Sequence, residues 1–154
     1  MQINMIAAMS SNRVIGNNNT LPRHFAEDFK HFKELTTGKV VVMWYNTFVS
    51  IGKPLPNRRN IILTSKTVEW VETFTSIDAM MDKLNADQVS EIWIIWGSSI
   101  YQQFLPHTNF IYLTEIKHAY IGDTYFPVFE DQFTQVGKEE HEEMDFLVYE
   151  RKTS

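Results

Sequence analysis

Four short apolar runs recur along the chain and constrain its fold more than any other feature. They are INMIAAM (3–9), KVVVM (39–43), NIILTS (60–65) and EIWIIW (91–96). Runs of this length, with little polar alternation, are typical of strands that are buried on both faces of a sheet. Segments with helical patterning separate them. The sequence therefore predicts an α/β fold with a mainly parallel sheet and helices on both faces.

The remaining elements follow from the same patterns. The predicted helices are 25–36, 46–51, 76–85 and 99–105. Ser76 is a candidate N-cap for the third of them. Further strands are expected within 66–75 and over 110–116. Near the C-terminus, FTQVGKEEHEE and FLVYERK indicate a hairpin that adds antiparallel strands at one edge of the sheet.

Composition narrows the class of protein. A chain of 154 residues suits one domain with one sizeable core. The net charge of −5 argues against duplex-DNA binding, because no basic field attracts phosphates. The absence of cysteine excludes disulfides and thiolate metal sites and is typical of a reducing cytoplasm. The N-terminus lacks a basic leader, and no stretch approaches the ~20 apolar residues of a membrane span. We therefore expect a soluble, cytoplasmic monomer that binds neither nucleic acid nor membrane.

One carboxylate stands in the apolar stripe of the first predicted helix. In FAEDFKHFKELT (25–36), Phe25, Phe29 and Phe32 take core-facing positions, and Asp28 shares that face. One interpretation is a carboxylate that is stabilised by the helix dipole, because it lies in the first turn. The other is a half-buried acid lining an apolar pocket. Desolvation would raise its pKa there and suit it to bind an amine-bearing heterocycle.

Two loops are candidates for binding. SSNRVIGNNNTLPRH (10–24) is long and rich in Asn, Ser and Gly, and long loops in compact domains are often functional. PLPNRRN (54–60) is stiffened by two prolines and carries Arg58 and Arg59. Two arginines in a loop are most often solvated. The alternative is a bidentate clamp for a carboxylate group.

Together, these segments resemble dihydrofolate reductase of the short bacterial type. The resemblance covers nearly the whole chain, and its motifs occur in the family's order and spacing. They are IAAMSSNRVIGNNNTLP, AEDFKHFKELTTGK, TFVSIGKPLPNRRNIILTS, GSSIYQQFLP, IYLTEI and GDTYFP. The resemblance implies a three-layer fold: a mostly parallel eight-stranded sheet with an antiparallel C-terminal hairpin, flanked by four helices. It also implies an adenosine-binding subdomain at about 39–89 and a remainder that bears a lid.

The implied activity is reduction of 7,8-dihydrofolate to 5,6,7,8-tetrahydrofolate by hydride transfer from NADPH. Asp28 matches the family's single pocket carboxylate, which binds the pterin amino group and N3 and supports protonation at N5. Tyr101 and Thr114 match polar groups near the nicotinamide and the pterin. Leu21 matches the tip of the active-site lid. These four residues are the implied catalytic set.

The same match implies the binding residues. Arg58 corresponds to the arginine that binds the glutamate α-carboxylate of the substrate, which leaves Arg59 as the solvated partner. The implied substrate-binding residues are Ile6, Ala7, Asp28, Phe29, Phe32, Ile51, Leu55, Arg58, Ile95 and Thr114. The implied cofactor-binding residues are Ala8, Ile15, Gly16, Asn19, Trp44, Tyr45, Thr47, Leu63, Thr64, Ser65, Lys66, Trp96, Gly97, Ser98, Ser99, Ile100, Tyr101 and Thr124. For the apolar residues among them, plain core packing is the alternative.

Several positions depart from the family near the expected ligands. The family has tryptophan at Arg23, glycine at Trp44 and Trp96, and usually glycine near Trp70. Trp96 replaces one partner of a Gly–Gly peptide that is cis in the family, and a cis non-proline bond costs ~2.5–4 kcal/mol. Either the indole enters the cofactor crevice or the backbone changes, and both predict weakened NADPH binding. Tyr45 replaces a residue that is often basic there, where it binds the 2′-phosphate.

Two alternatives to a dihydrofolate reductase follow. A folate-binding protein of the same fold would keep Asp28, Phe32 and Arg58, while Trp44 and Trp96 block the cofactor. The second alternative is a reductase that acts on another pterin-like or pyrimidine substrate. The PLPNRR segment favours a substrate with a carboxylate, and so favours dihydrofolate and folate analogues as ligands.

Overall fold

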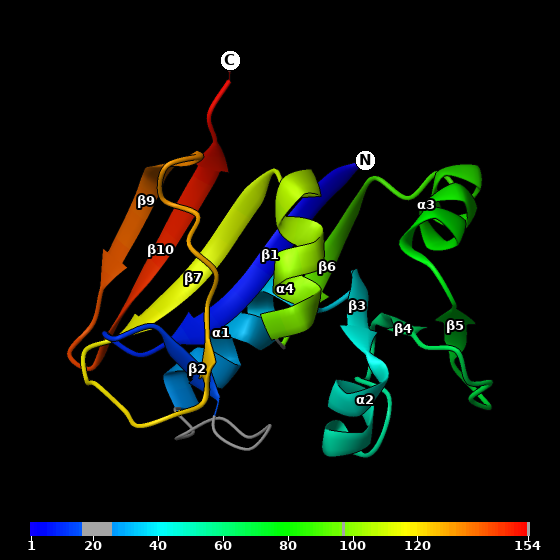
Figure 1. The fold of residues 1–154 in the computed structure, drawn as a ribbon, viewed down its shortest axis with the longest axis horizontal. Helices are drawn as coiled ribbons and strands as arrows, with labels where there is room; N and C mark the ends of the chain where they lie inside the picture. Colours follow the sequence, from blue (N-terminus) through cyan, green and yellow to red (C-terminus); the bar gives the residue numbers. More distant parts are fainter. Residues whose placement is uncertain (17–25, 97, 154) are drawn as a thin grey trace.

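A central eight-stranded sheet runs through the protein in the order β5-β4-β3-β6-β1-β7-β10-β9 (Figure 1). The computed structural model describes residues 1–16, 26–96 and 98–153. The strands of the sheet are β1 (Gln2–Met9), β3 (Val40–Trp44), β4 (Arg59–Leu63), β5 (Glu72–Phe74), β6 (Glu91–Ile95), β7 (Phe110–Ile116), β9 (Phe133–Glu140) and β10 (Met144–Arg151). The α-helices in the described ranges are α1 (Ala26–Thr36), α2 (Tyr45–Ile51), α3 (Ile77–Ala86) and α4 (Ser98–Phe104), and a 3₁₀ turn (Leu105–His107) follows α4.

Strand pairing has the predicted directions. Strands β5, β4, β3, β6, β1 and β7 pair in parallel. Strand β10 is antiparallel to both β7 and β9. A short turn joins β9 to β10, and short turns suit antiparallel neighbours, whereas parallel neighbours need crossover connections. The prediction of a mostly parallel eight-stranded sheet with a C-terminal hairpin and four helices is confirmed.

Side chains of the parallel strands alternate between two buried faces of the sheet. In β6, Ile92 and Ile94 pack with residues of α3 and α4 on what we call the α4 face. Trp93 and Ile95 pack with residues of α1 and α2 on the opposite side, which we call the α1 face. Figure 1 shows α4 in front of the sheet and α1 behind it. Both faces are covered, which explains why the strands are apolar along their whole length.

A second, two-stranded sheet joins the start of the long N-terminal loop to a distant segment. Strand β2 (Val14–Gly16) pairs with β8 (Thr124–Tyr125) in antiparallel fashion. The amide of Phe126 also donates to the carbonyl of Arg13 over 2.9 Å. The prediction of loop throughout 10–24 was therefore wrong for β2. A strand of three residues leaves too short a pattern to recognise, and its pairing partner lies far along the chain.

The boundaries of the other predicted elements lie within three residues of those observed, and the short strand β8 was not predicted. The N-cap prediction for α3 is confirmed, since the Ser76 hydroxyl accepts a hydrogen bond from the Ala79 amide over 3.1 Å. The short strand expected within 66–75 is β5 (Glu72–Phe74). Among the described residues, no helix is both long enough and apolar enough to cross a membrane.

Trp70 has a conformation that suits glycine. Its φ angle is 67° and its side chain is 94% exposed, so no packing offsets the left-handed backbone. A left-handed conformation costs a residue with a β-carbon about 1–2 kcal/mol, whereas glycine adopts it freely.

We predict that Trp70→Gly raises the free energy of unfolding by about 0.5–1 kcal/mol, because relief of the backbone strain exceeds the added entropy of the unfolded chain. Urea unfolding of both proteins measures the change. Glu69 is the matched control, because its φ angle is not positive. Glu69→Gly should lower stability, and a loss of stability in Trp70→Gly would contradict the strain argument.

Candidate active site

The centre of the candidate site is a carboxyl group held between a helix and a strand. Asp28 lies in the first turn of α1. The hydroxyl of Thr114, in β7, donates a hydrogen bond of 2.6 Å to Asp28 Oδ1. Thr114 points to the α1 face because it follows the alternation of β7, in which Ile111 and Leu113 pack on the α4 face. Two predicted site residues 86 positions apart in the chain are thus in direct contact.

Burial sets the protonation of this carboxyl. Desolvation raises the pKa of Asp28 above its usual value, and it outweighs the Thr114 hydrogen bond and nearby His31, which both lower it. Burial also lowers the pKa of His31, one turn further along α1. The interpretation of Asp28 as a half-buried acid requires a raised pKa, and burial provides it.

Contacts that the sequence did not reveal dock α1 on the C-terminal hairpin. The ring of His31 stacks on Phe146 of β10, with centroids 3.9 Å apart and planes at 10°. Nδ1 of His141 lies 3.0 Å from the carboxylate of Glu27. Phe146 pairs with Thr114 across the strands. Strand β7, which contacts Asp28, is therefore paired with β10, which contacts His31.

A cluster of apolar side chains lies on the α1 face, to which Thr114 and Asp28 also belong. Ile6, Phe32 and Ile95 are buried in one cluster with Val41, Met43, Ile62 and Trp93, and Ile51 and Leu55 pack against it. The structure thus gathers the predicted apolar substrate contacts, with two exceptions. Ala7 packs in the cluster of the α4 face. Phe29 is 39% exposed, so its prediction as a core-facing residue was wrong.

Trp96 packs against the same apolar cluster. Its ring stacks on Phe32, with centroids 4.8 Å apart and planes at 22°. Its φ angle is 42°, in the left-handed region. Its carbonyl accepts a hydrogen bond of 2.9 Å from the Thr47 hydroxyl, which ties the end of β6 to α2. The indole therefore lies on the substrate side of the predicted site, against the Phe32 ring.

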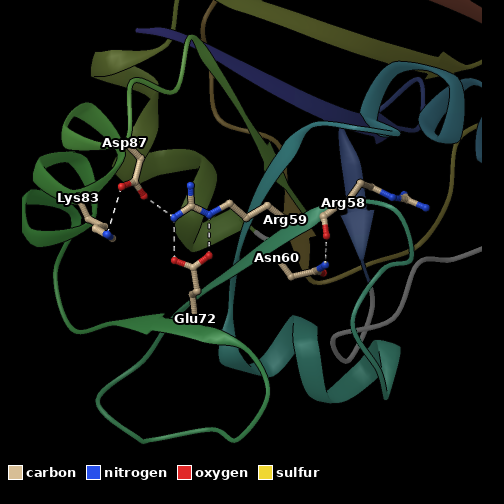
Figure 2. Close-up of polar contacts among 6 residues, drawn as sticks. All are labelled: Arg58, Arg59, Asn60, Glu72, Lys83 and Asp87. Carbon is tan, nitrogen blue, oxygen red and sulfur yellow. Dashed lines mark hydrogen bonds and ion pairs between the residues drawn. The ribbon is translucent and has the colours of Figure 1, made fainter.

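The two loop arginines have separate surroundings. Figure 2 shows Arg59 directed toward Glu72 and Asp87, and Arg58 extended the opposite way. Arg59 makes a bidentate pair with Glu72, at 2.6 and 2.8 Å, and a third contact of 2.8 Å with Asp87. These hydrogen bonds raise the pKa of Arg59. The prediction that Arg59 is a solvated partner was wrong, since it joins β4 to β5 and to the end of α3.

Arg58 is half-buried, and none of the described acidic side chains forms an ion pair with it. Its Nη1 donates to the Thr36 hydroxyl over 3.1 Å, and its Nε donates to the carbonyl of Pro56 over 2.9 Å. Its guanidinium carbon lies 5.8 Å from the centroid of the Phe32 ring. Partial burial lowers the pKa of Arg58. A cation beside the Phe32 ring is thus held by neutral groups.

Several predicted cofactor residues gather around the start of α2. The Lys66 ammonium lies 4.5 Å from the centroid of the Tyr45 ring, and the Thr64 hydroxyl accepts from the Lys66 amide over 3.1 Å. Trp44 precedes α2 and packs on the α4 face, and its indole N–H is buried without a hydrogen-bond partner. Lys66 therefore supplies a cation beside the tyrosine that replaces the family's basic residue.

The other predicted cofactor residues have mixed positions. Ile15, Leu63, Ile100 and Tyr101 are buried on the α4 face. The Tyr101 hydroxyl donates to the carbonyl of Ile6 over 2.8 Å, and burial raises its pKa. Ala8 and Thr124 are half-buried, Ser65 and Ser99 are exposed, Gly16 ends β2 and Ser98 begins α4. Asn19, Leu21, Arg23 and Gly97 lie outside the described residues.

Sequence reasoning missed two polar residues beside Arg58, namely Thr36 and Asn60. Both are buried. A signal for Thr36 was present: Asp28, Phe32 and Thr36 are spaced by four along α1 and so share one side of the helix. Asn60 directly follows two arginines at the start of a predicted strand, and no periodicity distinguishes it there.

Comparison with known proteins identifies one family throughout. The sequence profile described as dihydrofolate reductase matches residues 2–151. Dihydrofolate reductase of Bacillus subtilis (strain 168) is 37% identical over 161 aligned residues, which cover 99% of this chain and 96% of the relative. Dihydrofolate reductase type 3 of Salmonella typhimurium is 43% identical over 131 residues, covering 82% of this chain and 79% of the relative.

A solved structure of the same family is also similar to this chain in fold. Dihydrofolate reductase from Enterococcus faecalis, complexed with NADP(H) and RAB-propyl, superposes with a TM-score of 0.87 at 28% identity. The superposition covers 99% of this chain and 97% of that one. The likeness therefore extends over both faces of the sheet and the hairpin.

We predict that Thr114→Val raises the pKa of the Asp28 carboxyl further. The hydroxyl stabilises the charged form, so its loss favours the protonated form. An NMR titration of the ¹³C-labelled Asp28 carboxyl in both proteins measures the shift. A lower or unchanged pKa in Thr114→Val would show that the 2.6 Å contact does not control the ionisation.

Proposed function

The chain belongs to the dihydrofolate reductase family, and we propose that Asp28 is the acid of its active site and Arg58 its substrate anchor. The protein is an NADPH-dependent oxidoreductase that reduces 7,8-dihydrofolate to 5,6,7,8-tetrahydrofolate. The single observation that carries the assignment of Asp28 is its contact with Thr114 across 86 residues, on the face of the sheet that carries the apolar cluster. A buried carboxyl of this kind is the expected partner for a pterin amino group and N3.

Asp28 has two tasks in this proposal. In its charged form it accepts hydrogen bonds from the pterin and fixes the orientation of the ring. Its raised pKa keeps a larger fraction protonated near neutral pH than an ordinary aspartate would have, and this favours proton supply toward N5. Thr114 holds the carboxyl in place through Oδ1, so Oδ2 is the oxygen that we assign to the substrate.

The remaining surface suits the rest of the substrate. Phe32, Ile51 and Leu55 provide apolar contacts for the flat pterin and the benzoyl ring, both of which gain from burial. Arg58 lies beside Phe32 and offers a guanidinium fork to the glutamate carboxylate. Acid and cation thus bind opposite ends of one elongated ligand.

The residues present fit NADPH at the start of α2. Lys66 lies against Tyr45, where a phosphate of the cofactor needs a cation, and the backbone amides and hydroxyls of 64–66 adjoin it. When bound, NADPH supplies the hydride. Residues 39–89 are the proposed adenosine-binding subdomain.

We further propose that the protein acts as a cytoplasmic monomer and does not bind nucleic acid. The lack of cysteine suits a reducing compartment. The net charge of −5 disfavours association with phosphate backbones. Dihydrofolate, folate and antifolates are its proposed small-molecule partners.

A turnover assay tests the function. Purified protein with dihydrofolate and NADPH should lose the absorbance of the reduced nicotinamide at a rate proportional to enzyme concentration. A folded protein that binds folate without turnover would instead be the folate-binding protein considered above. That alternative is not favoured, because the relatives at 37% and 43% identity are reductases by name.

We predict that Asp28→Asn lowers turnover at neutral pH by about 100-fold or more, as expected when a positioned acid is removed. The same change should raise the free energy of unfolding at neutral pH, because the folded state no longer contains a desolvated carboxylate. This gain should shrink as the pH falls toward the ordinary value of 3.8, where the native carboxyl is neutral as well. Steady-state kinetics and urea unfolding at several pH values measure both effects. Full activity in the variant would make Asp28 merely structural.

We predict that Trp96→Gly raises both NADPH affinity and stability, and that Trp44→Gly raises NADPH affinity. Relief of the φ angle of 42° should contribute about 1 kcal/mol of stability in Trp96→Gly, whereas Trp44→Gly removes core contacts together with a buried N–H that lacks a partner. Titration with NADPH and urea unfolding measure the changes. Trp93→Gly in β6 is the control and should lower stability by about 3–5 kcal/mol, because Trp93 is packed in the core. Unchanged values in the first two variants would mean that the fold accommodates both indoles.

A further inference from the structure

We propose that Thr36 and Asn60 are positioning residues that hold the Arg58 guanidinium in place for the terminal carboxylate of the substrate. This inference rests on the proposed function, in which Arg58 binds that carboxylate. Neither residue is assigned a contact with the ligand. Both act through the arginine and the loop that carries it.

Thr36 links the arginine to the helix that carries Asp28. It is the last residue of α1, and its side chain is fully buried. Its hydroxyl donates to the carbonyl of Phe32 over 2.8 Å and accepts from Nη1 of Arg58 over 3.1 Å. With its proton committed to the helix carbonyl, the oxygen presents a lone pair to the guanidinium. The arginine is thereby oriented by the same helix that positions the acid.

Asn60 fixes the loop from the other side. Its Oδ1 accepts from the Leu55 amide over 2.9 Å, and its Nδ2 donates to the carbonyls of Leu55 over 2.9 Å and Arg58 over 3.0 Å. Figure 2 shows the contact between the Asn60 amide and the Arg58 carbonyl. Asn57, within the closed loop, has a φ of 60°. The Asn60 carboxamide therefore fixes the backbone of both Leu55 and Arg58.

The contrast with Arg59 shows why such positioning matters. Arg59 is held by two carboxylates, which satisfy its charge. Arg58 receives only neutral acceptors, the Thr36 hydroxyl and the Pro56 carbonyl, and no described carboxylate pairs with it. Neutral acceptors orient the planar fork and leave its charge available to an incoming carboxylate. A fork already oriented binds with less loss of side-chain entropy.

The test compares two substrates in Thr36→Val, which keeps the shape of the side chain and removes the hydroxyl. One substrate is dihydrofolate, and the other is a 7,8-dihydropterin that lacks the aminobenzoylglutamate. Thr36→Val should raise KM for dihydrofolate about tenfold, the effect of losing one hydrogen bond to a charged group, with kcat changed less than about twofold. KM for the short substrate should not change. Thr36→Ser, which restores the hydroxyl, should recover the original KM.

Thr37→Val is the matched control. Thr37 is the exposed neighbour whose hydroxyl bonds to the carbonyl of Lys33 over 2.6 Å, without reaching Arg58, so this variant should leave both KM values unchanged. Adding Thr36→Val to Arg58→Leu should cause no further loss, because the positioned group is already gone. Asn60→Asp, which loses both amide donors, should also raise KM for dihydrofolate selectively. Equal losses for both substrates, failure of Thr36→Ser to recover KM, or additivity with Arg58→Leu would overturn the proposal.

Binding of folate and of a pterin without its tail, followed by quenching of tryptophan fluorescence, gives the same comparison without turnover. A parent protein that binds folate selectively through Thr36 but does not turn over would refute the proposed reductase activity and leave the positioning role standing. A parent protein that reduces dihydrofolate, in which Thr36→Val has no selective effect on folate binding, would support the reductase activity and refute the positioning role.

Discussion

The hydrogen bond between Thr114 and Asp28 is the contact on which the rest of the site depends. It joins the first turn of α1 to the middle of the sheet at a distance of 2.6 Å, between residues 86 positions apart. Burying a carboxylate is costly unless partners satisfy it, and here the hydroxyl is one such partner. Desolvation prevails, so the pKa of Asp28 stays raised. The parallel sheet makes this possible, because it places β7 directly under the helix.

In the proposed site, the charges of the α1 face suit an elongated ligand with different ends. Asp28 stands at one end, and Arg58 lies beside the Phe32 ring, held by neutral acceptors. The second arginine of the loop has a structural task, since Arg59 joins two strands and the end of α3 through Glu72 and Asp87. Of two adjacent arginines in one short segment, one thus has a structural role and the other is the proposed binding residue. Arg59 begins β4 and Arg58 directly precedes it, and their side chains extend in opposite directions (Figure 2).

Much of this could be predicted from the sequence, for physical reasons that also explain the errors. The buried strands could be recognised from their apolar runs, and Asp28 could be recognised because it interrupts an apolar stripe. Phe29 shares that stripe yet is 39% exposed, because helical spacing alone cannot say where the covering layer ends. The role of Arg59 depends on Glu72 and Asp87, whose proximity is set by tertiary packing. Trp96 shows the same limit, since its stacking on Phe32 depends on a backbone angle that the sequence alone does not reveal.

The most direct test of the account is the pH dependence of hydride transfer, measured in a single turnover with dihydrofolate and NADPH. If the buried carboxyl controls protonation of the substrate, the rate should be highest at low pH. It should fall as the pH rises through an apparent pKa above the ordinary value of 3.8. A rate that stays constant across the acidic and neutral range would contradict the central claim that desolvation of Asp28 sets the chemistry of this site.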